Sequence, residues 1–287
     1  MSRQRKLFCQ LGPTAYRLSS WKCRTIRHVQ NLHDIGRWAL ERREERLPAL
    51  ICAHKSLIRR RLGEVDMRLQ ENKAINLALA APKVSGVLIK PGQLFSFWKL
   101  VGACTARKGY REGLTIGSGQ ARSGVGGGMC QFTNLIHWLA LHSPLDIAEH
   151  HHHDDYDLFP DFGRQVPFGV GTSIVYNYLD YRLQNNTDQT FQLVTYTTDE
   201  YLCGELRAES PLPAKYHIRT ENAYFSCENG IYYRNNEVFR TKIDKHTGCC
   251  LERQLIKKSH ARVLYDPKYI AEEGNGPCSC ERESTSR

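Results

Sequence analysis

The stretch "GVGGGMCQFTNLIHWLALHSPL" (residues 124–145) passes from three consecutive glycines into an apolar run. Within the run, apolar side chains recur at the three- and four-residue intervals of one helical face: Phe132, Leu135, Ile136 and Leu139. This spacing predicts a buried helix over residues 130–145 that begins at Cys130. Ser143 and Pro144 should end it, because the residue before a proline avoids helical geometry.

The segments before this helix predict a second helix and several short strands. Residues 70–84 have the alanine content and the apolar spacing of an amphipathic helix. Residues 86–90 and 94–102 read as strands on either side of "PG" (91–92), a strong turn pair. Residues 113–120 predict a short strand that leads into the glycine-rich loop.

After the helix, the pattern changes to that of strands. Residues 146–155 should be extended, and residues 172–184 and 190–202 read as long strands. The "NNTD" between them (185–188) predicts a hairpin turn. The sequence therefore predicts an α+β fold in which a buried helix packs on mainly antiparallel strands.

The two ends of the chain differ from this central part. Residues 1–69 are rich in Arg and Lys with apolar residues at roughly helical spacing, which predicts a basic helical arm packed on the main body. The "ESPLP" at 209–213 indicates a boundary, and turn residues then separate short strand-like runs. We therefore expect a core domain over 70–208, and a small β-meander over 209–287 whose tail from Glu272 is poorly ordered.

Composition limits the class of protein and suggests a kind of partner. The chain has 287 residues, of which 41% are hydrophobic, so it is globular. A formal net charge of +10 favours an anionic partner: nucleic acid, an acidic membrane surface or an anionic cell-wall polymer. The sequence has no zinc finger, RNP motif or KH loop, so we expect no specific binding of nucleic acid.

The cysteines and the N-terminus bear on the compartment. Eleven cysteines are scattered along the chain, an odd count that favours reduced thiols over a disulfide framework. The basic N-terminus holds no apolar run of signal-peptide length, and no stretch reaches the roughly 18 apolar residues of a membrane span. These features predict a cytoplasmic protein.

Cys130 is the candidate nucleophile. A helix N-terminus favours the thiolate, which is the reactive form of cysteine. Gly126, Gly127 and Gly128 can bring backbone N–H groups close to a substrate and form an oxyanion hole. Together these features suit acyl transfer. The alternative is that Cys130 is a small buried apolar residue beside a glycine turn.

A thiol nucleophile usually needs an imidazole to take its proton. His137 lies seven residues along the same helix, a rise of about 10 Å, and so cannot touch the sulfur. The "EHHHHDD" run (149–155) is the better source. In a strand His151 and His153 share one face and the other two histidines share the opposite face, and periodicity does not decide between the pairs.

A metal site is the main alternative for these histidines. Two histidines on one strand face would still need a third ligand. The cysteines at 249–250 and 278–280 do not have the usual zinc spacing. We therefore predict no metal and no cofactor.

Four stretches, residues 72–102, 109–110, 124–154 and 173–193, together resemble the VanW family. The shared features are an asparagine-bearing helix, "PGQLFSF", "GGGMCQ", a Glu-His stretch and a strand that ends in "NNTD". VanW proteins are associated with cell-wall metabolism and with glycopeptide resistance, and some are regarded as L,D-transpeptidases with a cysteine nucleophile. The implied partner is a peptidoglycan stem peptide or precursor.

The resemblance assigns roles by position. Cys130 would be the nucleophile, and His151 or His153 the general base or its orienting group. Ser96, Gly127 and Gln131 would shape the substrate pocket.

Two departures from the family pattern favour a different class of function. Gly171 stands where many members have an aspartate, and extracellular members carry an export segment that this chain lacks. The family implies action at the cell envelope, whereas the chain itself predicts the cytoplasm. The alternative is therefore a non-enzymatic accessory protein that binds a cell-wall precursor or a partner in a resistance response.

Overall fold

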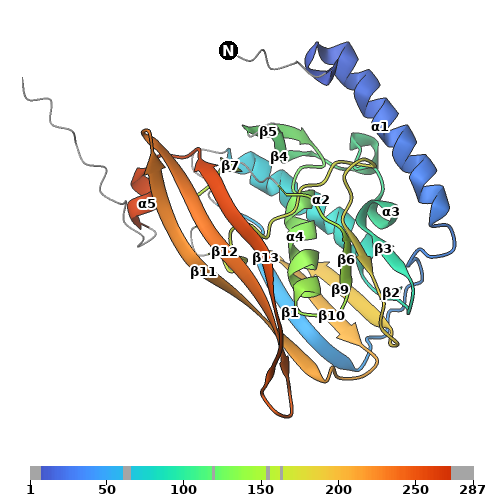
Figure 1. Cartoon of the computed structure of the whole chain (residues 1–287). Helices are drawn as coiled ribbons and strands as arrows, with labels where there is room; N and C mark the ends of the chain where they lie inside the picture. The colour runs from blue at the N-terminus through green and yellow to red at the C-terminus, as the bar shows by residue number, and fades with distance from the viewer. Residues whose placement is uncertain (1–7, 61–65, 118–119, 153–155, 162–163, 273–287) are drawn as a thin grey trace, which may run out of the picture.

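The computed structural model describes residues 8–60, 66–117, 120–152, 156–161 and 164–272. Its central sheet has the strand order β1-β10-β9-β2, with all neighbours antiparallel. The four strands are β1 (Ala49–Leu57), β10 (Tyr201–Ala208), β9 (Phe191–Thr197) and β2 (Val87–Ile89). Two helices pack on this sheet (Figure 1), and the mixed α+β fold is confirmed.

The helix predicted after the glycines is present as α4 (Met129–Leu141). Its four predicted core side chains are all 1% exposed or less. Gly204 of β10 lets the helix approach closely, because a Cβ there would lie 2.9 Å from Leu135 Cδ2. The helix ends at Leu141, just before the Ser143-Pro144 pair, as the sequence predicted.

The amphipathic helix is also confirmed, as α2 (Met67–Val84), which packs against β9. The strand predicted over 94–102 is only partly correct. Residues Leu94–Ser96 form β3, but Phe97–Val101 form the short helix α3. The Ser96 hydroxyl accepts a hydrogen bond from the Lys99 amide and caps α3, so the chain turns into a helix at that point.

The predicted long strand over 172–184 and its hairpin are wrong. Only Arg182–Gln184 form a strand, β8, because the chain makes a tight turn at Val175–Leu179 around Asn177, whose φ is 47°. β8 lies between β3 and β6 (Asp146–Glu149) in a second sheet, so it does not pair with β9. The run predicted over 190–202 is also divided, between β9 and β10.

The N-terminal region is helical only in part. The helices are η1 (Phe8–Gln10) and α1 (Pro13–His33), which runs along the outside of the molecule (Figure 1). Residues 49–57, expected in the helical arm, instead form β1 and pair with β10 along its length. Pairing with a core strand therefore outweighs the charge pattern that suggested a helix.

The remaining elements complete the molecule. A hairpin of β4 (Glu112–Gly117) and β5 (Gln120–Val125) precedes the glycine loop, after the short η2 (Ala106–Lys108). The predicted meander is confirmed as three long antiparallel strands, β11 (Ala214–Glu228), β12 (Ile231–Asp244) and β13 (Cys250–Val263). The short β7 (Tyr156–Asp157) joins β13 in parallel, and α5 is Lys268–Glu272.

The meander forms a curved sheet that reaches beyond the core (Figure 1). The tail predicted to be poorly ordered lies, apart from Glu272, outside the described residues. Within the described ranges, no helix has both the length and the apolar character needed to cross a membrane.

Candidate functional site

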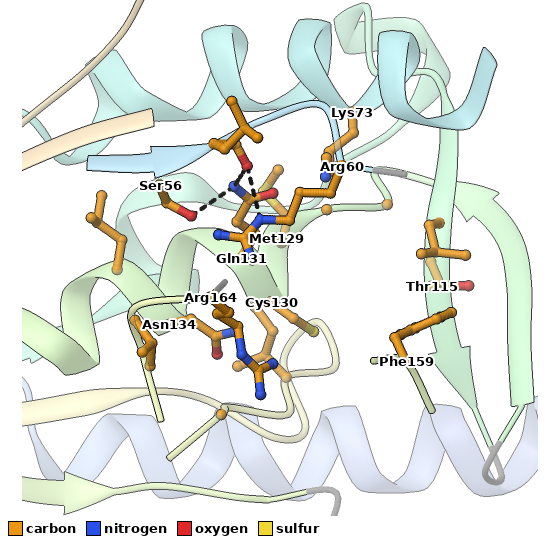
Figure 2. A pocket seen from close by; sticks show the side chains of 18 of the residues that line it. Ser56, Arg60, Lys73, Thr115, Met129, Cys130, Gln131, Asn134, Phe159 and Arg164 are labelled. Carbon is orange, nitrogen blue, oxygen red and sulfur yellow. Dashed lines mark hydrogen bonds between the residues drawn. The ribbon is translucent and has the colours of Figure 1, made fainter. Parts of the chain in front are cut away.

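A cavity of about 930 Å³ lies at the N-terminal end of α4. Its walls come from the glycine loop, α2, the end of β1 and the residues that follow it, residues 159–161 and 164–167, and residues 171 and 174–176. Figure 2 shows Cys130 and Asn134 of α4 within this cavity, with Lys73 and Arg60 toward one side and Arg164 toward another.

The glycine loop is held tightly by backbone contacts. Gly126 has φ +82°, and a Cβ there would lie 2.4 Å from the Cβ of Cys104. A Cβ on Gly127 would lie 2.2 Å from the carbonyl carbon of Gly113. Gly128, with φ 102°, is the N-cap of α4. Only glycine fits these three positions without displacing its neighbours.

Two of the glycine amides expected to form an oxyanion hole already have acceptors. Gly126 N donates to Arg111 O at 3.0 Å, and Gly127 N donates to Gly124 O at 3.1 Å. Of the first amides of α4, that of Gln131 donates to Gly128 O at 3.0 Å, that of Cys130 bonds its own thiol, and Gly128 supplies no side-chain cap for that of Met129. The start of α4, rather than Gly126 or Gly127, is therefore the part of the loop that could donate to an oxyanion.

Asn76 of α2 fixes the glycine loop, a role that the sequence did not reveal. Its side chain is fully buried, and its Nδ2 donates to Arg111 O and Gly127 O, both at 2.9 Å. Its Oδ1 accepts from Arg111 N at 2.8 Å. Asn76, one of the two asparagines of the helix by which the chain resembles the family, therefore supports the loop that precedes Cys130.

Cys130 is the second residue of α4 and lines the cavity. Burial raises the pKa of its thiol, while backbone hydrogen bonds from Ile174 and from Cys130 itself act in the opposite direction. Because the net pKa is raised, the sulfur is protonated at neutral pH. The sequence predicted an ionised thiolate here, and the structure instead gives a neutral thiol.

The segment 171–174 packs directly on the start of α4. Thr172 N donates to Asn134 Oδ1 at 2.7 Å, and the Thr172 hydroxyl lies 3.3 Å from Cys130 O. Gly171 lines the cavity, and a Cβ there would meet nothing closer than Asn134 Oδ1 at 4.0 Å. Position 171 therefore has room for a side chain.

The histidine run contacts the segment 171–174. His150 Nε2 is 3.1 Å from Gly171 O, and Ser173 N donates to His151 O at 2.7 Å. His151 Nε2 lies 2.9 Å from a Glu149 oxygen, and Glu149 also accepts two hydrogen bonds from Arg27. Among described residues, the histidines of the run do not line the cavity. His153 lies outside the described residues.

The other predicted site residues have structural contacts. Ser96 donates to Asp180 and is not among the residues that line the cavity. Gln131 lines it, but its Nε2 donates to Ser56 Oγ at 2.9 Å and to Leu57 O at 2.8 Å, so it ties α4 to β1 (Figure 2). His137 is buried and its Nδ1 lies 3.0 Å from the Tyr181 hydroxyl.

The cavity is rich in cations that the sequence analysis did not single out. The charged residues that line it are mainly basic: Lys55, Arg59, Arg60, Lys73 and Arg164, with Asp161 the acidic one. No set of three or more His, Cys, Asp or Glu side chains within the described ranges is arranged to hold a metal ion. The cavity therefore combines the Cys130 thiol with a group of positively charged side chains.

Comparison with known proteins places this site in a family. The model of the family described as VanW like protein matches residues 72–207. The vancomycin B-type resistance protein VanW of Enterococcus faecalis is 33% identical over 222 residues, which are 77% of this chain and 80% of that protein. The chain belongs to the VanW family.

A second relative is more distant. The uncharacterized protein YoaR of Bacillus subtilis is 28% identical over 122 residues, 42% of this chain and 37% of that protein. No solved structure gives a significant match. The segment matched by the VanW family model runs from α2 to β10 and contains the glycine loop and Cys130.

Proposed function

We propose that this VanW-family chain acts on peptide units of cell-wall material, as a cysteine acyltransferase of the L,D-transpeptidase type. The observation that carries the proposal is Cys130, which lies in the cavity wall at the N-terminus of α4. The relative from Enterococcus faecalis is named as a vancomycin B-type resistance protein, which supports a role in glycopeptide resistance.

The reaction would proceed in two balanced steps. The Cys130 sulfur, once deprotonated, bonds to the carbonyl carbon of the third residue of a stem peptide, and the amide bond to the terminal D-alanine breaks. The departing amine takes up a proton. An amine of a neighbouring stem then attacks the thioester, loses its own proton and releases the thiol.

Proton transfer is assigned to His151 or His153 by the family resemblance. His151 has a carboxylate partner in Glu149, at 2.9 Å, which could orient an imidazole where Gly171 supplies no aspartate. Since His151 does not line the cavity, the segment that carries it must move toward Cys130 when the substrate binds.

The second candidate function is an accessory protein that binds a cell-wall precursor without chemistry. The raised pKa of the buried Cys130 thiol favours it, because a neutral thiol is a poor nucleophile.

The two functions differ in the release of D-alanine from a stem peptide that ends in D-alanine. Cys104 lines the same cavity, so Cys104→Ala is the matched control for Cys130→Ala. We expect the wild type and Cys104→Ala to release D-alanine and Cys130→Ala to release none. Release by Cys130→Ala would refute the nucleophile. Binding of the peptide by the wild type without release would establish the accessory function.

A further inference from the structure

Lys73 has an unusual position in the cavity wall. It belongs to α2, and only 6% of its surface is exposed. Its aliphatic stem packs against Gly128, where a Cβ would lie 2.3 Å from Lys73 Cγ. The N-cap of α4 is thus a glycine that leaves room for this lysine, and the lysine is held beside the start of that helix.

Lys73 has no counter-ion among the described residues, and the Arg60 side chain is attracted by Asp161 without a direct ion pair. Arg59 pairs with Glu71 at 2.7 Å, and Arg164 pairs with Asp161 at 2.8 Å. Lys73 has neither an ion pair nor a hydrogen bond to any residue that the structure describes, and Arg60 reaches only Leu57 O, at 3.4 Å. Figure 2 shows the two side chains together at one side of the cavity.

This arrangement is costly without a ligand. A buried charge that lacks a partner is destabilising, and two neighbouring cations repel each other. Burial, and after it the charges of Arg60 and Arg59, together lower the pKa of Lys73 to about 7. The groups facing Lys73 from the adjoining segments are thus other cations, and an anion is the ligand that would relieve the repulsion.

The start of α4 adds to the same preference. A helix N-terminus carries a partial positive charge and free N–H donors, both of which favour an anion. Gly128 places those donors beside the stem of Lys73. Three kinds of positive group therefore converge on one side of the cavity: an ammonium, a guanidinium and backbone amides.

We infer that the cavity binds an oxyanionic group of its ligand, a carboxylate or a phosphate, between Lys73 and Arg60 beside the first turn of α4. The inference rests on the proposed function in that both use the same cavity. For a stem peptide the oxyanion is the C-terminal carboxylate; for a nucleotide-linked precursor it is a phosphate. Held there, the ligand lies along the wall that contains Cys130.

The test measures binding by calorimetry in the Cys130→Ala background, in which acylation by this thiol cannot occur. The probes are an N-acetylated Lys-D-Ala peptide with a free carboxylate, the same peptide as its C-terminal amide, and inorganic pyrophosphate. We expect the free acid or pyrophosphate to bind, and the amide to bind at least about tenfold more weakly than the acid, since charge-assisted hydrogen bonds are lost.

Variants locate the binding site. Lys73→Met and Arg60→Gln should each weaken binding of the oxyanion probe by about tenfold or more. The matched control is Lys83→Met, on the same helix, because Lys83 bonds Val101 O and the Tyr110 hydroxyl and does not line the cavity. It should bind the probe as the parent does.

Proton linkage gives a further readout. Binding of an anion raises the pKa of Lys73, so between pH 7 and 9 the complex should take up a proton that Lys73→Met does not take up. Calorimetry in two buffers of different ionisation enthalpy measures this uptake.

Each outcome is decisive. Tighter binding of the acid than of the amide identifies the carboxylate as the ligand group, and tight Lys73-dependent binding of pyrophosphate alone identifies a phosphate. Equal binding of acid and amide without pyrophosphate binding, no binding of any probe, or unchanged binding by both variants would overturn the inference. Because Cys130 is absent from the assay, intact binding combined with failure to release D-alanine would reject only the proposed chemistry.

Discussion

Cys130 illustrates how far a single residue can be understood from sequence. Its place at a helix start after three glycines was predicted correctly, since glycine runs and apolar spacing are local signals. The protonation state of its thiol was not predicted, because the pKa is raised by burial in the folded chain, and the opposing hydrogen bond comes from Ile174, more than 40 positions away.

The raised pKa of Cys130 has a direct kinetic consequence. Only the thiolate reacts with iodoacetamide, so the alkylation rate at Cys130 should still be rising with pH at pH 9. Peptide mapping by mass spectrometry measures the rate at this residue, with Cys130→Ala as the blank. A rate that levels off by pH 7 would show a thiolate already formed and would contradict the neutral thiol.

The glycine loop gives a matched pair of substitutions. A Cβ on Gly127 would lie 2.2 Å from the carbonyl carbon of Gly113, whereas a Cβ on Gly171 would lie 4.0 Å from its nearest neighbour, Asn134 Oδ1. We expect Gly127→Ala to reduce the free energy of unfolding by about 3 kcal/mol and Gly171→Ala to change it by less than about 0.5 kcal/mol. Urea titrations measure both, and equal values for the two variants would disprove the tight packing of the loop.

The helices were easier to predict than the strands. α2 and α4 have long periodic patterns, and both were found at close to their observed bounds. β1 was missed because its basic surroundings resembled a helical arm, and its partner β10 lies about 150 residues away. The stretch at 172–181 was taken for a strand because β-branched and aromatic residues are frequent there, although a turn at Asn177 interrupts it.

The outer helix α1 is attached by few contacts. None of its residues is fully buried. Arg27 donates to both Glu149 oxygens at 2.7 Å and to Tyr178 O at 2.7 Å. Such a bidentate pair is stronger than a single ion pair. Two further hydrogen bonds also hold α1, from Arg182 Nη2 to Asn31 Oδ1 at 2.6 Å and from Asn177 Nδ2 to Arg24 O at 3.2 Å.

Removal of this anchor should loosen α1 while the core stays folded. We expect Arg27→Ala to accelerate thermolysin cleavage within Pro13–His33 several-fold, with little change in the melting temperature of the core. Arg17→Ala, at an exposed position of the same helix, is the control. Equal cleavage of both variants and the wild type would mean that other contacts hold the helix.

In the molecule as a whole, the buried charge of Lys73 opposes folding. Below about pH 7 Lys73 is charged in both the folded and the unfolded chain, so the burial penalty is fully present. Between about pH 7 and its ordinary pKa of 10.5 the folded protein has lost a proton that the unfolded chain keeps. The contribution of Lys73 to the free energy of unfolding therefore becomes more favourable to the folded state as the pH rises through that range.

Lys73→Met removes the charge and keeps most of the aliphatic stem. We expect the variant to melt at a higher temperature than the wild type at pH 6, with a difference that becomes smaller toward pH 9. Scanning calorimetry across this range measures it, with Lys83→Met as the control. A variant that melts lower than the wild type at pH 6 would show that the lysine stabilises the fold.

The most direct measurement is to find where a stem peptide becomes attached. The wild type is mixed with a stem peptide that ends in D-alanine, quenched in acid, and digested for mass spectrometry. The proposed chemistry predicts a thioester on the fragment that contains Cys130, with the mass of the peptide acyl group after loss of the terminal D-alanine. An acyl group on another residue, or no acyl group although D-alanine is released, would contradict it.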